Sequence, residues 1–217
     1  MSPFRFRVRI RLVALLLALG VSLVLAHSAA AQEGPVAFDT VPKHLIMIML
    51  DGFRPDYVAM YAPPNIARLV REGVWVAEGE SVFPSMTTPN QTSFVTGSLP
   101  ATTGIPNNSR YDRERDAVLS PLRDNRVPTI AEILRDNGWS TASVNHFMLQ
   151  GRGAQWYTRG DMETLIRMFE ANPPGLAVYY NDETDAAGHT HGPFSPETRA
   201  AVLNADAEIG RLLDALE

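Results

Sequence analysis

The stretch His44-Leu-Ile-Met-Ile-Met-Leu50, followed by Asp51-Gly52, decides the fold of this chain. Its apolar run is almost unbroken, which is typical of a central parallel strand covered on both faces. Gly52 lets the backbone turn sharply after the strand. Asp51 is then expected at the carboxyl end of the strand, where open α/β sheets bind their ligands. An Asp-Gly pair in this place is equally typical of a simple hydrogen-bonded turn.

Outward from this strand, helical and strand patterns alternate along the chain. Glycine and proline residues end the helical segments, and Ser195-Pro196 has the residue types that begin one. Alternation of this kind predicts an α/β fold, a layered and mostly parallel sheet with helices on both faces. The expected helices are 64–72, 128–137, 162–171 and a last one from Pro196, and the expected strands are 74–77, 140–145 and 176–180.

The first 31 residues have the pattern of an export signal. Four arginines between residues 5 and 11 precede an apolar run from Leu12 to Ala26, and Ala29-Ala-Ala31 offers a cleavage site. The run has 15 residues, fewer than the ~18–20 of a membrane span, so a retained membrane anchor is the weaker alternative. We therefore expect a signal peptide over residues 1–31. The protein would be exported, periplasmic or secreted, and would meet the membrane only through this signal.

Charge and cysteine content narrow the possible functions. Of the 19 basic residues four lie in the signal, which leaves 15 against 24 acidic residues, a net charge of −9. Such an acidic protein repels nucleic-acid polymers, but a small phosphorylated substrate can bind where cations reverse the charge locally. Because the chain has no cysteine, any metal must be held by carboxylate, imidazole and hydroxyl groups rather than by thiolates.

The stretch Phe83-Pro-Ser-Met-Thr-Thr-Pro-Asn90 offers hydroxyl groups at the start of a helix. Thr87 and Thr88 precede Pro89, which suits the first turn of a helix that ends at Gly97. The positive end of a helix dipole and its unpaired amides favour an alkoxide and phosphoryl oxygens. A threonine hydroxyl needs metal coordination to become nucleophilic at neutral pH. A helix cap is the structural alternative for either threonine.

Two further segments carry polar groups that suit the same chemistry. Gly104-Ile-Pro-Asn-Asn108 is a turn whose side-chain amides can donate to a phosphoryl oxygen, or merely stabilise the turn. After the strand at 176–180, Asp185 and His189 are four residues apart with Gly188 between them, so a loop can fold both onto one ion. A carboxylate with an imidazole is half of a usual zinc site, and a solvated loop is the alternative.

The other histidines and nearby acids are given smaller roles. Asp182 and Glu183 are expected to be loop acids that help orient the metal site. His191 is expected at the rim of the site rather than among the ligands. His44 and His146 adjoin strands and are expected to be ordinary surface or packed histidines.

Together these segments resemble the nucleotide pyrophosphatase/phosphodiesterase family of the alkaline phosphatase superfamily, over roughly residues 44–215. The most specific part of the resemblance is the run from Phe83 to Asn90, with the segments that follow it up to Asn108. The resemblance implies an alkaline phosphatase-like fold and a site with two divalent metal ions, most commonly Zn²⁺. In that site Thr87 is the nucleophile and Asn108 binds the phosphoryl group.

The resemblance also implies the metal ligands and the reaction. Asp185 and His189 would serve one ion, and Asp51 and Thr87 the other. The reaction would be hydrolysis of phosphodiester or pyrophosphate bonds in a small phosphorylated substrate, through a phosphothreonine intermediate. Oxygen and imidazole ligands would accept manganese or iron as well as zinc.

The chain departs from the family pattern after its last metal-binding motif. Family members continue with a strand ending in an Asp-His pair and with a later histidine, which residues 190–217 do not supply. We therefore expect residues 32–217 to be the amino-terminal part of the catalytic domain of a longer enzyme, with weak metal binding and little turnover by themselves. A non-catalytic fragment that binds without turnover is the alternative.

The second departure concerns the substrate. Nucleotide-cleaving relatives commonly have an aromatic residue directly after the nucleophile, where this chain has Thr88. Tyr180 remains as a stacking surface, or simply as strand packing. A small polar residue at this position is also similar to phosphonoacetate hydrolase, and phosphomonoesterase activity is a further alternative. The exact substrate and the oligomeric state are not predicted.

Overall fold

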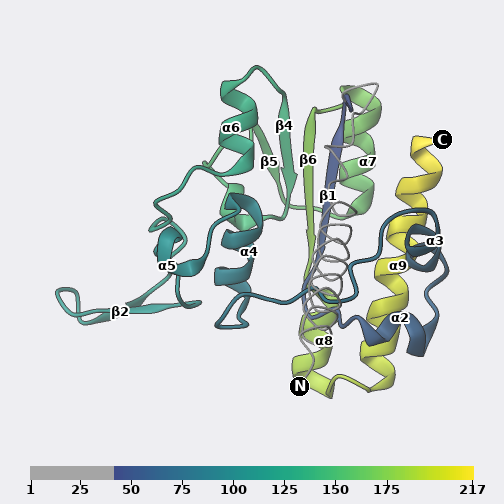
Figure 1. Cartoon of the computed structure of the whole chain (residues 1–217), viewed down its shortest axis with the longest axis horizontal. Coiled ribbons are helices and arrows are strands. Elements are labelled where there is room, and N and C mark those ends of the chain that lie inside the picture. Colours follow the sequence, from purple (N-terminus) through teal and green to yellow (C-terminus); the bar gives the residue numbers. More distant parts are fainter. Residues whose placement is uncertain (1–41) are drawn as a thin grey trace, which may run out of the picture. The chain divides into compact units, whose positions relative to one another are not determined.

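A computed structural model describes residues 42–217, so the predicted export signal lies outside the described residues (Figure 1). The centre of the fold is a sheet of four parallel strands in the order β1-β6-β4-β5. Because the strands are parallel, their carboxyl ends meet at one edge of the sheet. The strands are β1 (Leu45–Leu50), β6 (Leu176–Asn181), β4 (Thr141–Val144) and β5 (Trp156–Thr158).

Helices cover both faces of this sheet (Figure 1). On one side lie α7 (Met162–Ala171) and α9 (Pro196–Leu216), and on the other α4 (Thr87–Thr96) and α6 (Ile130–Asp136). Alternate residues of β1 enter the two cores. Ile46, Ile48 and Leu50 pack with residues of α7 and α9, and Met47 and Met49 pack with residues of α4 and α6. Side chains of a strand point alternately to its two faces, so this strand must be apolar throughout. The predicted α/β fold class is confirmed.

The position of β1 within the sheet differs from the prediction. Within residues 42–217, β1 pairs with β6 alone and so lies at an edge rather than at the centre. Its residues are only partly buried, and Leu45 is 43% exposed, whereas every residue of β6 is buried. The apolar sequence of β1 therefore indicates that both of its faces are covered, but it does not indicate which strands pair with it on either side.

The helix ends follow their capping residues. Helix α3 (Pro64–Glu72) and α7 have the predicted bounds. Helix α6 begins two residues later than predicted because Thr129 caps it. The Thr129 hydroxyl accepts from the Glu132 N–H at 3.1 Å, and the Thr129 N–H donates to the Glu132 carboxylate at 2.8 Å. Helix α9 begins behind Ser195, as predicted.

The predicted strand at 74–77 is not formed. This segment is a loop between α3 and α4, and Val74 and Val76 are 92% and 70% exposed. β-branched and aromatic residues favour a strand only where a neighbouring strand offers hydrogen bonds and a surface to pack on. No strand of residues 42–217 pairs with this segment.

Several short elements were not expected from the sequence pattern. They are α2 (Asp56–Tyr61), α5 (Pro100–Thr103), the 3₁₀ helix η1 (Phe147–Leu149), α8 (Glu183–His191), and an antiparallel hairpin of β2 (Arg110–Asp112) and β3 (Ala117–Leu119). Among the described residues, no helix has the length and apolar character needed to cross a membrane.

Candidate active site

Two segments that are far apart in the sequence meet at the carboxyl ends of β1 and β6. Asp51 directly follows β1, and its N–H donates to the carbonyl of Asn181, the last residue of β6, at 2.9 Å. Gly52 has a φ of +66°, and a Cβ at this position would lie 2.6 Å from the Cα of Asp185. Glycine suits both the backbone conformation and the close contact. The turn after β1 therefore packs directly against the helix that carries Asp185.

Asp185 and His189 lie on helix α8, and not on the loop that was predicted. The Asn181 side chain accepts from the Glu183 N–H at the start of this helix, at 2.9 Å. Acidic residues occupy the first turn and histidines the last, which suits the helix dipole. Residues four apart share a helix face, and His189 Nε2 lies 3.5 Å from Asp185 Oδ1. The predicted pair is thus brought together by a turn of helix.

The charge of Asp51 acts on the carboxylate of Asp185. Burial raises the pKa of Asp185 above its ordinary value, and the negative charge of Asp51 raises this pKa further. Like charges this close destabilise each other, and a divalent cation bound to them would reverse the effect. The donor groups at this edge of the sheet therefore suit a metal ion.

The Asp51 carboxylate is held at both oxygens. Oδ1 accepts from the Gly52 N–H at 3.0 Å, and Oδ2 accepts from the Tyr180 hydroxyl at 2.7 Å. Burial, followed by the bond to Asp51, raises the pKa of Tyr180 well above its ordinary value, so the hydroxyl keeps its proton and remains a donor. The sequence analysis gave Tyr180 a stacking or packing role and missed this bond.

Thr87 and Asn108 meet at the start of α4. Thr87 is the first residue of the helix, and Asn108 Oδ1 accepts from the Thr88 N–H at 2.7 Å. Asn108 thereby provides the side-chain cap that Met86, at the N-cap position, does not. Its Nδ2 group is a donor of the kind that binds a phosphoryl oxygen.

Asn90 fastens the loop that leads into Thr87. Its Oδ1 accepts from the Val82 N–H at 2.8 Å, and its Nδ2 donates to the carbonyls of Met86 and Pro84 at 2.9 and 3.2 Å. These bonds tie residues 82–86 to the first turn of α4. The sequence analysis quoted Asn90 as part of a motif but assigned it no role.

All five residues singled out as a site line one cleft of about 890 Å³. They are Asp51, Thr87, Asn108, Asp185 and His189. Asp51 follows the end of β1, Asp185 and His189 lie on α8, Thr87 begins α4, and Asn108 lies in the loop between α5 and β2. The tertiary structure therefore gathers a nucleophile candidate, a phosphoryl-binding candidate and metal-ligand candidates around one space.

Other residues that line the cleft were not singled out from the sequence. Arg54 pairs with the Asp56 carboxylate at 2.9 and 2.7 Å, and its guanidinium carbon lies 5.0 Å from the ring centroid of Phe194. Phe94 is 55% exposed and lies about two helical turns after Thr87, so helical spacing along α4 could have found it. For Arg54 the sequence offers no signal beyond its closeness to Asp51.

The remaining predicted residues take mostly structural places. Asp182 lies between β6 and α8, as predicted for a loop residue, whereas Glu183 is the first residue of α8, so the loop prediction is wrong for Glu183. His44 is bonded to a backbone carbonyl, and His146 is fully buried, as expected of packed histidines. His191 is the exposed last residue of α8.

The described residues do not form a complete protein site for one metal ion. Within residues 42–217, no three His, Asp or Glu side chains stand close enough together to hold one ion. In the predicted arrangement, residues 42–217 provide two ligands for each ion: Asp185 and His189 for one, and Asp51 and Thr87 for the other. Carboxylate, imidazole and hydroxyl groups fit zinc and also fit manganese or iron.

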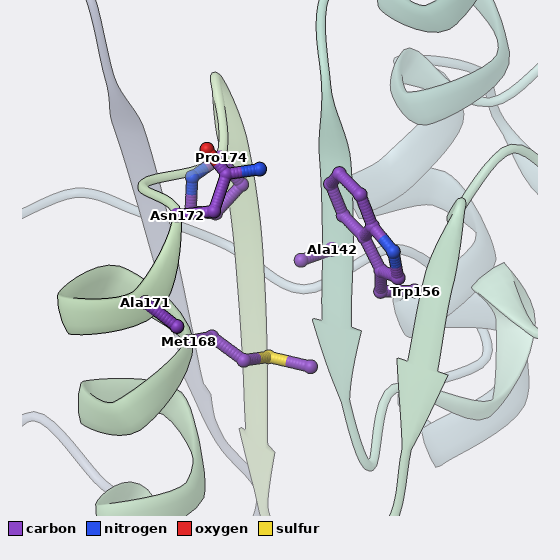
Figure 2. Close-up of a pocket in the computed structure, with 6 residues that line it drawn as sticks. All are labelled: Ala142, Trp156, Met168, Ala171, Asn172 and Pro174. Atoms are coloured by element: carbon purple, nitrogen blue, oxygen red, sulfur yellow. The ribbon is translucent and has the colours of Figure 1, made fainter.

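A second, smaller pocket of about 200 Å³ lies at the opposite, amino ends of the strands (Figure 2). Ala142 and Trp156 lie near the starts of β4 and β5, and Met168 comes from the last turn of α7. The lining residues are Ala142, Trp156, Met168, Ala171, Asn172 and Pro174. None of these side chains is ionisable, so this pocket offers no acid, base or imidazole.

The fold and the cleft define a class of protein, an alkaline phosphatase-like α/β fold with hydroxyl, amide, carboxylate and imidazole groups at the carboxyl edge of its sheet. The family model described as type I phosphodiesterase / nucleotide pyrophosphatase matches residues 45–217. The chain belongs to this family. The resemblance found in the sequence motifs is thereby confirmed.

Relatives with known names match most of this chain. Bis(5'-adenosyl)-triphosphatase ENPP4 from Bos taurus is 32% identical over 200 residues, which are 81% of this chain and 44% of that protein. Ectonucleotide pyrophosphatase/phosphodiesterase family member 1 from Homo sapiens is 28% identical over 219 residues, covering 88% of this chain and 23% of that protein. The chain thus spans less than half the length of these relatives.

Solved structures share the fold. An inactive threonine-to-alanine form of murine ENPP5 in complex with AMP has a TM-score of 0.71 at 22% identity, and the match covers 81% of this chain and 52% of that chain. Phosphonoacetate hydrolase from Sinorhizobium meliloti 1021, in complex with phosphonoformate, has a TM-score of 0.64 at 21% identity, with 80% and 54% covered. The predicted alkaline phosphatase-like layered fold is confirmed.

Proposed function

We propose that this chain carries the nucleophile and part of the metal site of an exported hydrolase that cleaves phosphodiester or pyrophosphate bonds. The observation that carries the proposal is the single cleft lined by Asp51, Thr87, Asn108, Asp185 and His189. Membership of the type I phosphodiesterase / nucleotide pyrophosphatase family supports the reaction class. The substrates would be small phosphorylated compounds, because the acidic chain disfavours nucleic-acid polymers.

The metal site would take two divalent ions, most commonly Zn²⁺. Asp185 and His189 would hold one ion, and Asp51 and Thr87 the other. When bound, such ions lower the pKa of an attacking hydroxyl and neutralise charge on the phosphoryl oxygens. The raised pKa of Asp185, caused by burial and then by Asp51, supports the binding of positive charge at this edge of the sheet.

Thr87 would attack the phosphorus in line with the leaving group. The Thr87 hydroxyl would lose its proton to solvent, a bond would form from Oγ1 to phosphorus as the bond to the leaving group breaks, and water would later hydrolyse the phosphothreonine and free Thr87. Asn108 would donate from Nδ2 to a phosphoryl oxygen, since its Oδ1 is already engaged by the Thr88 N–H. The inactivity of the threonine-to-alanine form of murine ENPP5 supports a threonine nucleophile in this fold.

Replacing the nucleophile tests this proposal in the full gene product. Thr87→Ala should abolish hydrolysis of an aryl phosphodiester while leaving zinc content largely intact. Thr96→Ala is the matched control, because Thr96 lies at the far end of the same helix, where its hydroxyl donates to the carbonyl of Thr92 at 2.8 Å and accepts from the Ser98 N–H at 3.3 Å. Full activity of Thr87→Ala would overturn the assignment, and a zinc-loaded wild type without turnover would favour a fragment that binds without catalysis.

Phosphonate or phosphomonoester hydrolysis is a second candidate. Thr88 is only 6% exposed and has no ring, so it offers no stacking surface beside Thr87 for a nucleotide base. Phe94 is the exposed aromatic group that the cleft provides on the same helix. A panel of phosphodiester, phosphomonoester and phosphonoacetate substrates separates the candidates, and preference for phosphonoacetate would replace the first proposal.

A further inference from the structure

The Asp51 side chain is not free to rotate in the cleft. It accepts one hydrogen bond on each carboxylate oxygen, from the Gly52 N–H at 3.0 Å and from the Tyr180 hydroxyl at 2.7 Å. An ionised carboxylate can accept at about four positions. Two donors therefore fix its plane and leave an accepting position on each oxygen for another partner.

The donor Tyr180 is itself held rigidly. It lies in β6 beside Met49 of β1 and is 7% exposed. Its ring meets the ring of Phe147 nearly perpendicularly, at 5.5 Å between centroids and 88°, and that of His146 at 6.1 Å and 78°. Edge-to-face contacts of this kind stabilise one ring orientation. The hydroxyl is thus aimed at Asp51 by packing that lies outside the cleft.

The neighbouring residue Tyr179 makes a similar bond on the other face of the sheet. Its hydroxyl donates to Glu208 of α9 at 2.9 Å, and the Asn181 amide donates to the same oxygen at 3.0 Å. Successive side chains of a strand point to opposite faces, so these adjacent tyrosines serve different carboxylates. Tyr179 is buried and bonded like Tyr180 but has no contact with the cleft, which makes it a matched control.

We propose that Tyr180 is a positioning residue that orients the Asp51 carboxylate for a divalent cation. This inference rests on the metal site proposed above. Outer partners that fix the orientation of a ligating carboxylate typically change metal affinity by roughly 10–100-fold when they are removed. Tyr180 would therefore act through Asp51 and would not itself touch the ion or the substrate.

Zinc affinity, measured on the full gene product by competition with a chelating dye, tests this role without using activity. Tyr180→Phe should weaken Zn²⁺ binding on the order of tenfold. Tyr179→Phe should keep the affinity of the wild type within about twofold, although it also loses a buried hydroxyl. Asp51→Asn serves as the reference for a lost ligand and should weaken binding more than Tyr180→Phe.

The outcomes separate this inference from the proposed site. Wild-type affinity in Tyr180→Phe, together with weak binding in Asp51→Asn, would overturn the positioning role and leave the site standing. Wild-type affinity in Asp51→Asn would overturn both. Equal losses in the two tyrosine variants would show a general structural effect and would also refute the role.

If circular dichroism shows that Tyr180→Phe does not fold, Phe147→Leu takes its place. This change removes the perpendicular ring that holds Tyr180 and leaves the hydroxyl present. The positioning role predicts weaker zinc binding, by a smaller factor than the loss of the hydroxyl itself. Unchanged zinc binding in a folded Phe147→Leu protein would count against it.

Discussion

The two ends of the parallel sheet differ in what they offer, although the same strands form both. At the carboxyl ends, a cleft of about 890 Å³ is lined by two carboxylates, an imidazole, a threonine hydroxyl and an asparagine amide. At the amino ends, a pocket of about 200 Å³ is lined by apolar groups and a single amide (Figure 2). A further pocket at the amino end of β1 includes His44 and Glu170, but the five predicted site residues all line the cleft at the carboxyl ends.

Helix direction explains the contrast. Helices α8 and α4 both begin at the carboxyl edge; the first turn of α4 lines the cleft with the positive end of its dipole, and α8 contributes Asp185 and His189. Helix α7 ends at the amino edge, where Met168 contributes only packing surface to the small pocket. A parallel sheet thus provides anion-binding groups at one end only, and substitutions at the two ends should have different consequences.

The largest effect should come from removing a charged ligand at the carboxyl end. Asp185→Asn keeps the shape of the side chain and removes its charge, so hydrolysis of an aryl phosphodiester should fall on the order of 10³-fold. Trp156→Ala at the amino end should cost roughly 1–2 kcal/mol of stability and leave turnover nearly unchanged. If steady-state kinetics showed equal losses of turnover in Asp185→Asn and Trp156→Ala, the two ends of the sheet would not differ in function as proposed.

Asn108 allows its two roles to be separated. Asn108→Asp keeps an oxygen that accepts from the Thr88 N–H, as Asn108 Oδ1 does now, but removes the Nδ2 donor. We expect kcat to fall by roughly 10²–10³-fold with little change in Tm. Asn108→Ala should lower both kcat and stability, the latter by about 1 kcal/mol, because the helix cap is lost as well. Full activity of the aspartate variant would remove Asn108 from the phosphoryl site.

Gly52 tests the contact that brings the two carboxylates together. In Gly52→Ala the new Cβ would lie 2.6 Å from the backbone of Asp185, so the turn must move away from α8. We expect turnover to fall on the order of 10²-fold because the site loses its geometry. Gly97→Ala is the control, since Gly97 has a similar φ of +62° with nothing within 4 Å of its Cβ. A similar loss of turnover in both variants would point to backbone strain instead.

The smallest effect on stability at neutral pH, and a clear effect in acid, is expected from replacing His146, which lies beside the cleft. Burial lowers the pKa of His146 to about 4, below the unfolded value of about 6.5. The unfolded chain therefore binds a proton at a higher pH than the folded one, and stability should fall as the pH drops from about 6.5 to 4, by about 3 kcal/mol in total. In urea denaturations over a pH series, His146→Phe should lose less stability between about pH 6.5 and 4 than the wild type. The same pH dependence in both proteins would contradict the attribution of this loss to His146.

Local sequence patterns predicted the elements that end at capping residues. Ser195 begins α9 and Gly97 ends α4 with a φ of +62°, as predicted, whereas the Thr129 cap that begins α6 two residues after the predicted start was missed. These signals act within a few residues, so they can be read without the fold. The prediction failed for 74–77 because a strand needs a partner that the local sequence does not specify.

Helix α8 was predicted to be a loop, although its sequence contained a signal for a helix. Its sequence contains Gly188 and two threonines, which favour helices weakly. Its acidic first turn and its histidines in the last turn are nonetheless typical of a helix. The side chain of Thr184 is buried, so packing of the fold also supports the helix.

By itself the sequence determined the apolar strand β1, the helix caps, the kinds of ligand present and the family to which the chain belongs. Only the tertiary structure decided that Asp51 meets Asp185, that Tyr180 donates to Asp51, and that β1 lies at an edge of the described sheet. The physical reason is the sequence distance over which each kind of interaction acts. Caps and periodicity depend on neighbours within one or two turns, whereas these contacts join residues more than a hundred positions apart and depend on the order in which the strands pair.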